Sequence, residues 1–242
     1  MVGVHRGINN DCRFSSAILK AKEKGTIPLV SDIKPISPRD GDLLGKRNPG
    51  ELAGELAKAG ACALSVVTEK KHFGGSITML REVIRAVPLP VLRKDFFSSP
   101  DQIVESHKAG AAAVLLTLCT ISDSLAPVLY QCTRDLGMEA LVEVHTEHEI
   151  ERALALCPTM IGINNRNLLE LEKDSGDVSV TEKLAPLIPD TIVTISESSL
   201  LTSRDIYRAI QAGADAVLVG TAILQSMDSA ARLGELIFKG GN

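Results

Sequence analysis

The chain of 242 residues contains no tryptophan, and only 3% of its residues are aromatic. The chain also lacks a large basic region. Its lysines and arginines are scattered among acidic residues, and its formal net charge is −4. The densest basic cluster, at residues 70–72, is too short to follow a nucleic-acid backbone. The composition therefore argues against a nucleic-acid-binding protein.

Long apolar segments and cysteine pairs are missing as well. The longest largely apolar run covers the 11 residues 109–119, whereas a membrane-spanning helix needs about 20. The N-terminus shows no signal-peptide core. The five cysteines are widely spaced and include no Cys-x-x-Cys pair, a pattern typical of reduced thiols. We therefore expect a cytoplasmic protein without a disulfide framework.

Aliphatic residues dominate what is present, and a repeat organises them. Three segments contain Ala-Gly-Ala followed by an apolar stretch, with the glycine at Gly60, Gly110 and Gly213. In each segment the glycine can end a helix in the left-handed conformation before a buried strand begins. The glycines are 50 and 103 residues apart, which corresponds to two and four units of about 25 residues, the usual length of one βα unit in a barrel.

The repeat and the apolar pattern together predict eight strands that alternate with helices. Such alternation indicates parallel pairing, and eight nearly equal units favour a closed (β/α)8 TIM barrel over a doubly wound open sheet. We expect one barrel domain at residues 27–242 behind a short N-terminal extension, residues 1–26, with a helix near residues 15–24. The expected strands are 27–33, 63–67, 90–93, 113–117, 140–144, 160–163, 192–195 and 216–219.

Polar and charged residues gather at the carboxyl ends of the expected strands, which is where barrel enzymes place their chemistry. Side chains alternate along a strand, so Asp32 and Lys34 share one face, as do Glu143 and His145. Ion pairs that only stabilise the rim are the alternative reading for any single strand end. Five strand ends together favour a functional mouth, because unpaired charges in a half-buried site rarely persist without a use. The five groups are 32–34, 94–96, 143–145, 164–166 and 197–198.

Two further patterns concern bound groups. Ser198 and Ser199 after the seventh strand, and Gly220 and Thr221 after the eighth, predict a phosphate site, since these two loops hold phosphate in many barrels. Two histidines at positions 145 and 148 lack a convincing third ligand, so no metal site is expected. The Gly74-Gly75 pair is more typical of a flexible loop than of a phosphate cradle.

From about residue 27 onward, the chain resembles the indole-3-glycerol-phosphate synthase family. Each matching motif is short, but they occur in the family's order and together are specific. The motifs are Asp-Ile-Lys-Pro-Ile-Ser-Pro at 32–38, Ser-Val-Val-Thr-Glu at 65–69, His-Phe-Gly-Gly-Ser at 72–76, Arg-Lys-Asp-Phe at 93–96, Glu-Ala-Leu-Val-Glu at 139–143, Gly-Ile-Asn-Asn-Arg at 162–166, Ser-Glu-Ser at 196–198 and Leu-Val-Gly-Thr at 218–221.

The resemblance implies a carboxy-lyase of tryptophan biosynthesis, an aromatic amino acid pathway. Its substrate would be 1-(2-carboxyphenylamino)-1-deoxyribulose 5-phosphate, and its products indole-3-glycerol phosphate, carbon dioxide and water. No cofactor and no nucleic-acid or membrane partner is implied, and association with other enzymes of the pathway is left open.

The resemblance also assigns roles to residues. Lys94 would be the general acid of ring closure, Lys34 would contact the substrate carboxylate and assist proton transfer, and Glu143 would act as acid or base in dehydration. The sequence does not settle how the two lysines divide the work. The remaining implied residues are Asp32, Asn164, Arg166 and Glu197 around the substrate, Phe73 and Phe96 in the aromatic-ring pocket, and Ser37, Ser198, Gly220 and Thr221 at polar groups that include the phosphate.

Three positions depart from the family's pattern. Asp32 stands where glutamate is usual, Pro35 follows the first lysine, and Ser199 stands where glycine is usual, so a side chain there is expected to crowd the phosphate. These departures keep two alternatives open: another phosphosugar barrel enzyme, and a barrel that binds without catalysis. An isomerase-like site would want cysteine and aspartate where Lys34 and Asn164 stand, and a Schiff-base aldolase would want a lysine on the sixth strand.

Overall fold

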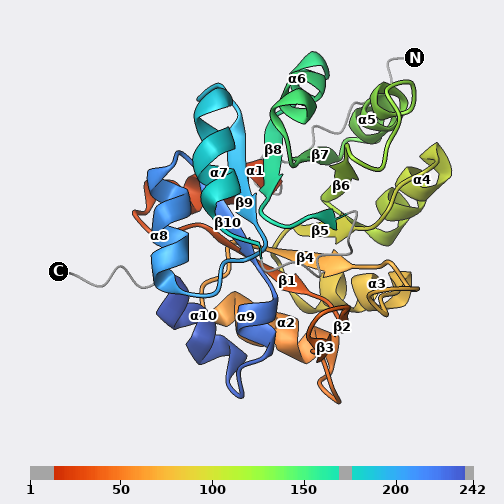
Figure 1. Cartoon of the computed structure of the whole chain (residues 1–242). Helices are drawn as coiled ribbons and strands as arrows, with labels where there is room; N and C mark the ends of the chain where they lie inside the picture. The colour runs from red at the N-terminus through yellow and green to blue at the C-terminus, as the bar shows by residue number, and fades with distance from the viewer. Residues whose placement is uncertain (1–13, 169–175, 238–242) are drawn as a thin grey trace.

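A computed structural model describes residues 14–168 and 176–237 as eight parallel strands that close into a barrel inside a ring of helices (Figure 1). The order around the barrel is β1-β10-β9-β8-β7-β6-β5-β4, and every neighbouring pair is parallel. This arrangement is the expected (β/α)8 barrel. The strands are β1 (Leu29–Ile33), β4 (Ala63–Val67), β5 (Val91–Lys94), β6 (Ala113–Thr117), β7 (Glu139–Val144), β8 (Met160–Asn164), β9 (Val193–Glu197) and β10 (Ala216–Val219).

The helices that surround the strands begin and end at residues that suit those positions. Pro100 opens α4, where Ser99 and Gln102 form a capping box. The repeat glycines Gly60, Gly110 and Gly213 all adopt positive φ, as their place between a helix and a strand predicted. The helices are α2 (Pro49–Lys58), α3 (Ile77–Ala86), α4 (Pro100–Ala109), α5 (Ala126–Asp135), α6 (Glu147–Ala155), α7 (Ser179–Leu184), η3 (Ala185–Leu187), α8 (Ser203–Gln211), α9 (Thr221–Leu224) and α10 (Ser229–Ile237).

A two-stranded hairpin that the sequence pattern did not predict follows β1. It consists of β2 (Ile36–Ser37) and β3 (Gly41–Asp42), which pair antiparallel. The backbone N–H of Ile36 donates to the carbonyl of Phe73 at 3.0 Å, so the hairpin is joined to the loop after β4.

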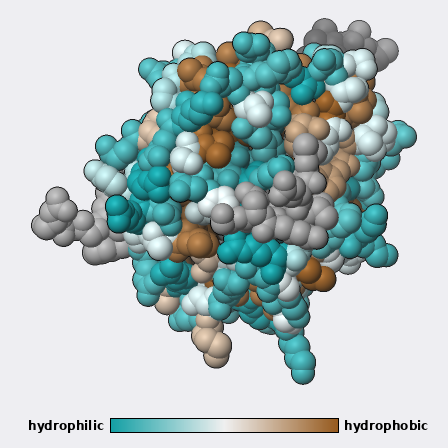
Figure 2. All heavy atoms as spheres, viewed as in Figure 1, coloured by the Kyte–Doolittle hydropathy of each residue, from teal (hydrophilic) through white to brown (hydrophobic). Residues whose placement is uncertain are grey.

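Side chains alternate between two apolar layers. Outward-facing residues pack against the helices, while inward-facing residues fill the lower part of the barrel, away from the carboxyl ends of the strands. The surface seen in Figure 2 is mainly hydrophilic, with hydrophobic residues scattered over it. Within the described ranges, none of the helices combines the length and apolar character needed to span a bilayer.

The N-terminal helix α1 (Phe14–Glu23) closes the barrel at the amino ends of the strands, which we call the floor. Phe14 and Ile18 are fully buried among the inward-facing residues of the strands. Ser15 donates to Glu139, the first residue of β7, and Lys22 pairs with Asp215, which lies just before β10. The helix therefore lies at the end of the barrel opposite to the carboxyl ends of the strands.

Replacing Ile18 with valine is expected to lower the free energy of unfolding by about 1 kcal/mol, because it removes one buried methylene and leaves a small cavity. Leu19, which is 43% exposed on the same helix, offers the matched control. Leu19→Val removes the same group from the surface and should cost only a few tenths of a kcal/mol. Urea unfolding of both variants measures the difference. Equal losses would contradict the placement of Ile18 in the barrel core.

Candidate active site

The alternation within the strands brings the polar residues of several strand ends to the inside of the barrel. On β1, Val30 lies in the interior core and Asp32 follows on the same face, with Lys34 directly after the strand. The same spacing places Lys94 above Leu92 on β5, and Glu143 above Leu141 on β7. The sequence therefore builds an apolar barrel core with a charged upper layer.

Lys94 lies at the centre of this charged layer. Its Nζ is 3.0 Å from Glu197 Oε2, to which it donates a hydrogen bond, and 3.8 Å from Glu143 Oε2. Both carboxylates are fully buried, whereas the Lys94 side chain is 15% exposed. Asn164 donates from Nδ2 to Glu143 Oε2 at 3.3 Å. The Lys94 ammonium thus lies near two buried carboxylates, and its side chain still reaches the mouth of the barrel.

The two carboxylates make this cluster sensitive to pH near neutrality. Burial raises the pKa of Glu197, the Lys94 ammonium counteracts this in part, and Glu143 raises it further, to about 7. An ionised Glu197 holds Lys94 through a charged hydrogen bond that protonation of the carboxylate weakens.

We expect kcat/KM to rise by about tenfold between pH 6 and pH 8, as Glu197 ionises and fixes Lys94 in place. Glu197→Gln should remove the part of the profile centred near pH 7, in addition to lowering the rate. Titratable groups of the substrate contribute equally to both proteins, so the difference between the two profiles isolates Glu197. Identical profile shapes would contradict this assignment.

The outward-facing side chain before Lys94 fixes the end of β5. Arg93 is 4% exposed, and its guanidinium donates to Thr68 Oγ1 at 2.9 Å, to Asp95 Oδ2 at 3.0 Å and to Glu105 Oε2 at 2.9 Å. These bonds tie β5 to the loop after β4 and to α4. Lys94 therefore starts from a rigid backbone, which is what a positioned acid requires.

Two aromatic rings form one wall of the mouth. The Phe73 and Phe96 ring centroids are 6.4 Å apart with an interplanar angle of 59°. The Glu69 carboxylate accepts the backbone N–H groups of Lys71, His72 and Phe73 and thereby holds the loop that carries Phe73. A flat ring can be bound at this wall.

The loops after β9 and β10 form the opposite wall. Ser198 and Ser199 adopt φ values of 66° and 54°, in the left-handed region that residues other than glycine rarely occupy. Asn165 holds this turn, because its Nδ2 donates to Ser196 Oγ at 3.0 Å and to the carbonyls of Glu197 and Ser198 at 2.9 and 3.1 Å. The turn is therefore fixed by the buried amide of the residue that directly follows the neighbouring strand β8.

Gly220 and Ser199, two small residues at this wall, are each explained by a different contact. A Cβ on Gly220 would lie 3.1 Å from side-chain atoms of Asp32, so the close approach of β10 to β1 favours glycine there. At Ser199, the hydroxyl accepts a hydrogen bond from Arg166 Nε at 3.2 Å. The side chain that departs from the family's glycine thus gains a partner in this chain.

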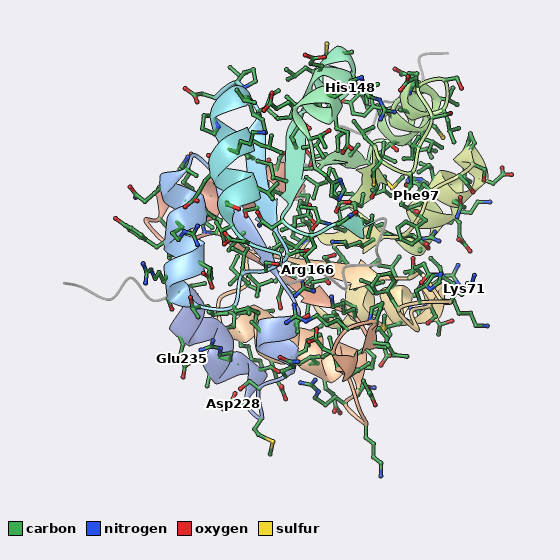
Figure 3. All side chains as sticks on the ribbon, in the orientation of Figure 1. Lys71, Phe97, His148, Arg166, Asp228 and Glu235 are labelled. Carbon is green, nitrogen blue, oxygen red and sulfur yellow. The ribbon has the colours of Figure 1, made fainter. Side chains whose placement is uncertain are left out.

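A pocket that is partly open to solvent lies between these walls. Arg166 lies over the centre of the barrel, whereas Lys71 and His148 lie at its periphery (Figure 3). Most of the residues expected from the sequence line the pocket. These are Asp32, Lys34, Phe73, Lys94, Phe96, Glu143, Arg166, Ser198, Gly220 and Thr221.

The other three expected residues lie elsewhere. Asn164 and Glu197 do not line the pocket and reach it through their contacts with Glu143 and Lys94. Ser37 is buried in the hairpin, where its hydroxyl donates to Asp40 Oδ2 at 2.9 Å.

Sequence reasoning missed some pocket and support residues. Leu115 and Thr117 line the pocket from β6, and the alternation of that strand could have indicated them. Asn165 belongs to the polar group 164–166 expected at a strand end, but no local pattern indicated that its amide would hold residues of β9 and α7.

Comparison with known protein families shows to which family the chain belongs. A family model described as indole-3-glycerol phosphate synthase matches residues 4–236. The chain belongs to the indole-3-glycerol phosphate synthase family. Its similarity to curated members of that family extends over nearly the whole chain.

Three relatives, each named indole-3-glycerol phosphate synthase, illustrate this similarity. The chain is 43% identical to the protein of Thermococcus kodakarensis over 224 residues, which cover 93% of this chain and 96% of the relative. The values for the protein of Pyrococcus furiosus are the same. Identity to the protein of Dehalococcoides mccartyi strain CBDB1 is 42% over 231 residues, with 94% and 88% covered.

Solved structures of more distant sequence share the fold of this indole-3-glycerol phosphate synthase family member. One is a chain of a cube-shaped, highly porous cage designed by fusing symmetric oligomeric domains, with a TM-score of 0.64 at 13% identity over 87% of this chain and 71% of that one. Another, described as a native KDPGal structure, gives a TM-score of 0.61 at 15% identity and covers 87% and 91% of the two chains. At these identities the likeness concerns the fold alone.

Proposed function

We propose that the chain converts 1-(2-carboxyphenylamino)-1-deoxyribulose 5-phosphate into indole-3-glycerol phosphate, carbon dioxide and water, with Lys94 as the general acid. The observation that carries the proposal is the Lys94 ammonium, held 3.0 Å from the buried Glu197 carboxylate at the bottom of a pocket with an aromatic wall. The family to which the chain belongs supports the reaction, and the geometry supports the residue roles.

Ring closure requires an aromatic carbon to attack the ketone of the sugar chain, which leaves negative charge on the ketone oxygen. A positioned ammonium stabilises that charge and protonates the developing alkoxide. Lys94 fits this role because two buried carboxylates face its ammonium group and the bonds of Arg93 hold its strand end. Lys34, on the same barrel rim, is 7% exposed and lines the pocket, so it is our candidate for contact with the substrate carboxylate.

Decarboxylation restores the aromatic ring and needs no further group from the protein. Dehydration then requires an acid for the departing hydroxyl and a base for the carbon that loses its proton. Glu143 can do both in sequence, because it is buried and is held by Asn164 on the Lys94 side. Asp32, whose side chain packs against Gly220, supplies a further carboxylate at the first strand.

The two walls of the pocket suit the two ends of the substrate. The Phe73 and Phe96 rings offer an apolar site for the benzoate ring. The opposite wall offers Arg166, Ser198, Gly220 and Thr221 for the phosphate end, as the loops of many barrels do. Ser37 joins this set only if its hydroxyl leaves Asp40. Cytoplasmic location and association with other pathway enzymes stay predictions.

The direct test is turnover. Purified protein supplied with the anilino substrate should release indole-3-glycerol phosphate, detected by its fluorescence, together with one equivalent of carbon dioxide. Folded protein that binds a substrate analogue in calorimetry without turnover would instead support a binding barrel and contradict the proposal.

A further inference from the structure

The proposed reaction has a proton balance that the residues described so far do not complete. The substrate enters with an ionised carboxylate, and carbon dioxide and water leave. One proton goes to the ketone oxygen in ring closure, a second goes to the departing hydroxyl, and one returns when the final carbon is deprotonated. Each turnover therefore consumes one proton, and Lys94, which gives the first proton and does not receive it back, must be recharged.

The protein buries the groups next to Lys94. Glu143 and Glu197 have no exposed surface, and substrate in the pocket would cover the exposed part of Lys94. The proton must then reach the cluster through a side chain that touches both a buried carboxylate and a more accessible region.

His145 has this position. It lies two residues after Glu143, and its Nε2 is 3.8 Å from Glu143 Oε1. Its Nδ1 is 3.1 Å from Glu149 Oε2, which also accepts the backbone N–H of His145 at 2.8 Å. The side chains of His145 and Glu149 are each 13% exposed, whereas that of Glu143 is fully buried.

The two oxygens of Glu143 face different partners. Oε2 receives the hydrogen bond from Asn164 and lies 3.8 Å from Lys94 Nζ. Oε1 and His145 Nε2 are both buried, and neither makes a hydrogen bond to the residues that the structure describes. Glu143 thus lies between Lys94 and His145, and a small closure of the 3.8 Å gap would join it to the imidazole.

The charged and titratable groups around His145 favour its protonated form. Burial disfavours the imidazolium, but the Cys119 thiol on the loop after β6, Glu149 on α6 and Glu143 on β7 outweigh it and raise the pKa of His145 to about 10. Arg152 lies beyond Glu149 and, together with His145, lowers the pKa of Glu149, whose burial acts in the opposite direction. The imidazole therefore carries a proton for Glu143 at neutral pH.

We propose that His145, oriented by Glu149, is a positioning residue that returns the consumed proton to Lys94 through Glu143. Once Lys94 has given its proton to substrate, Glu143 passes a proton to the lysine and the imidazolium gives its Nε2 proton to Glu143. Solvent then reprotonates the imidazole, so one proton enters for each product formed. The inference rests on the proposed function.

The test separates the first turnover from later ones, because Lys94 begins each experiment already charged. In His145→Gln, the single-turnover rate with enzyme in excess should stay within about twofold of wild type. Steady-state kcat should fall about tenfold with little change in KM, since repeated cycles need the relay. Added imidazole should restore part of the steady-state rate, and Glu149→Gln should show a weaker form of the same pattern.

His148 provides the matched control, since it is exposed on α6 three residues away (Figure 3). His148→Gln should keep both rates, and circular dichroism should show all variants folded. Equal slowing of the first and later turnovers, failure of imidazole to restore the rate, or an unchanged kcat in His145→Gln would each overturn the inference. An inactive wild-type enzyme would instead defeat the proposed function, so the two failures are distinguishable.

Discussion

Lys94→Ala is expected to lower kcat/KM by about 10³-fold while the barrel stays folded. In the proposed mechanism the lost ammonium stabilises and protonates the developing alkoxide, and general acid catalysis of this kind contributes about 10²–10⁴-fold. The fold should tolerate the change because Glu197, with its pKa already near 7, can take up a proton when its partner is removed. The fluorescence assay and a thermal unfolding curve measure the two effects separately.

Lys71 is the control for this variant. It is exposed on the loop after β4, away from the centre of the barrel (Figure 3). Lys71→Ala removes the same side chain and charge and should leave kcat/KM within about twofold. If Lys94→Ala retained full activity, Lys94 would have no part in the mechanism, and the role of acid would pass to Lys34.

Gly162→Ala is expected to lower kcat by about 10²-fold, although the new methyl group never touches substrate. A Cβ at this position of β8 would overlap with Glu197 Oε1. The Glu197 side chain is fully buried and must therefore turn away, which disrupts its 3.0 Å hydrogen bond with Lys94. Misplacing a catalytic group by about 1 Å costs rates of this order.

Gly54 in α2 is the matched control, because a Cβ there meets no atom within 4 Å. Gly54→Ala should leave kcat unchanged and stabilise the helix by up to about 1 kcal/mol. Steady-state kinetics and thermal unfolding of both variants would measure this contrast. Wild-type kcat in Gly162→Ala would show that the position of Glu197 does not control Lys94.

The sequence predicted the parts of the site that depend on local alternation. Asp32 with Lys34, and Glu143 with His145, were expected to share faces because strand geometry has a period of two residues. In the structure Asp32, Lys34 and Glu143 line the pocket, and His145 Nε2 lies 3.8 Å from Glu143 Oε1. The left-handed glycines before the strands were predictable for a similar reason, since a helix that turns into a strand needs a residue that accepts positive φ.

Contacts that depend on segments far apart in the chain could not be predicted from the sequence. The bond from the Ser37 hydroxyl to Asp40 is local, but it forms in a hairpin that is joined to the distant Phe73 loop and that the strand pattern did not predict. The Asn165 amide likewise depends on β9 and on Thr181, which donates to Asn165 Oδ1 at 2.9 Å. The expected crowding at Ser199 considered only the backbone, whereas the structure gives the hydroxyl a bond from Arg166 that no local pattern encodes.

Helix α1 determines how molecules can pass through the barrel. Phe14 and Ile18 are fully buried against the interior core at the amino ends of the strands, so among the residues that the structure describes the pocket lies at the other end, above that core. In the proposed reaction, substrate would therefore enter, and carbon dioxide and water would leave, at the end of the barrel where Lys94 lies.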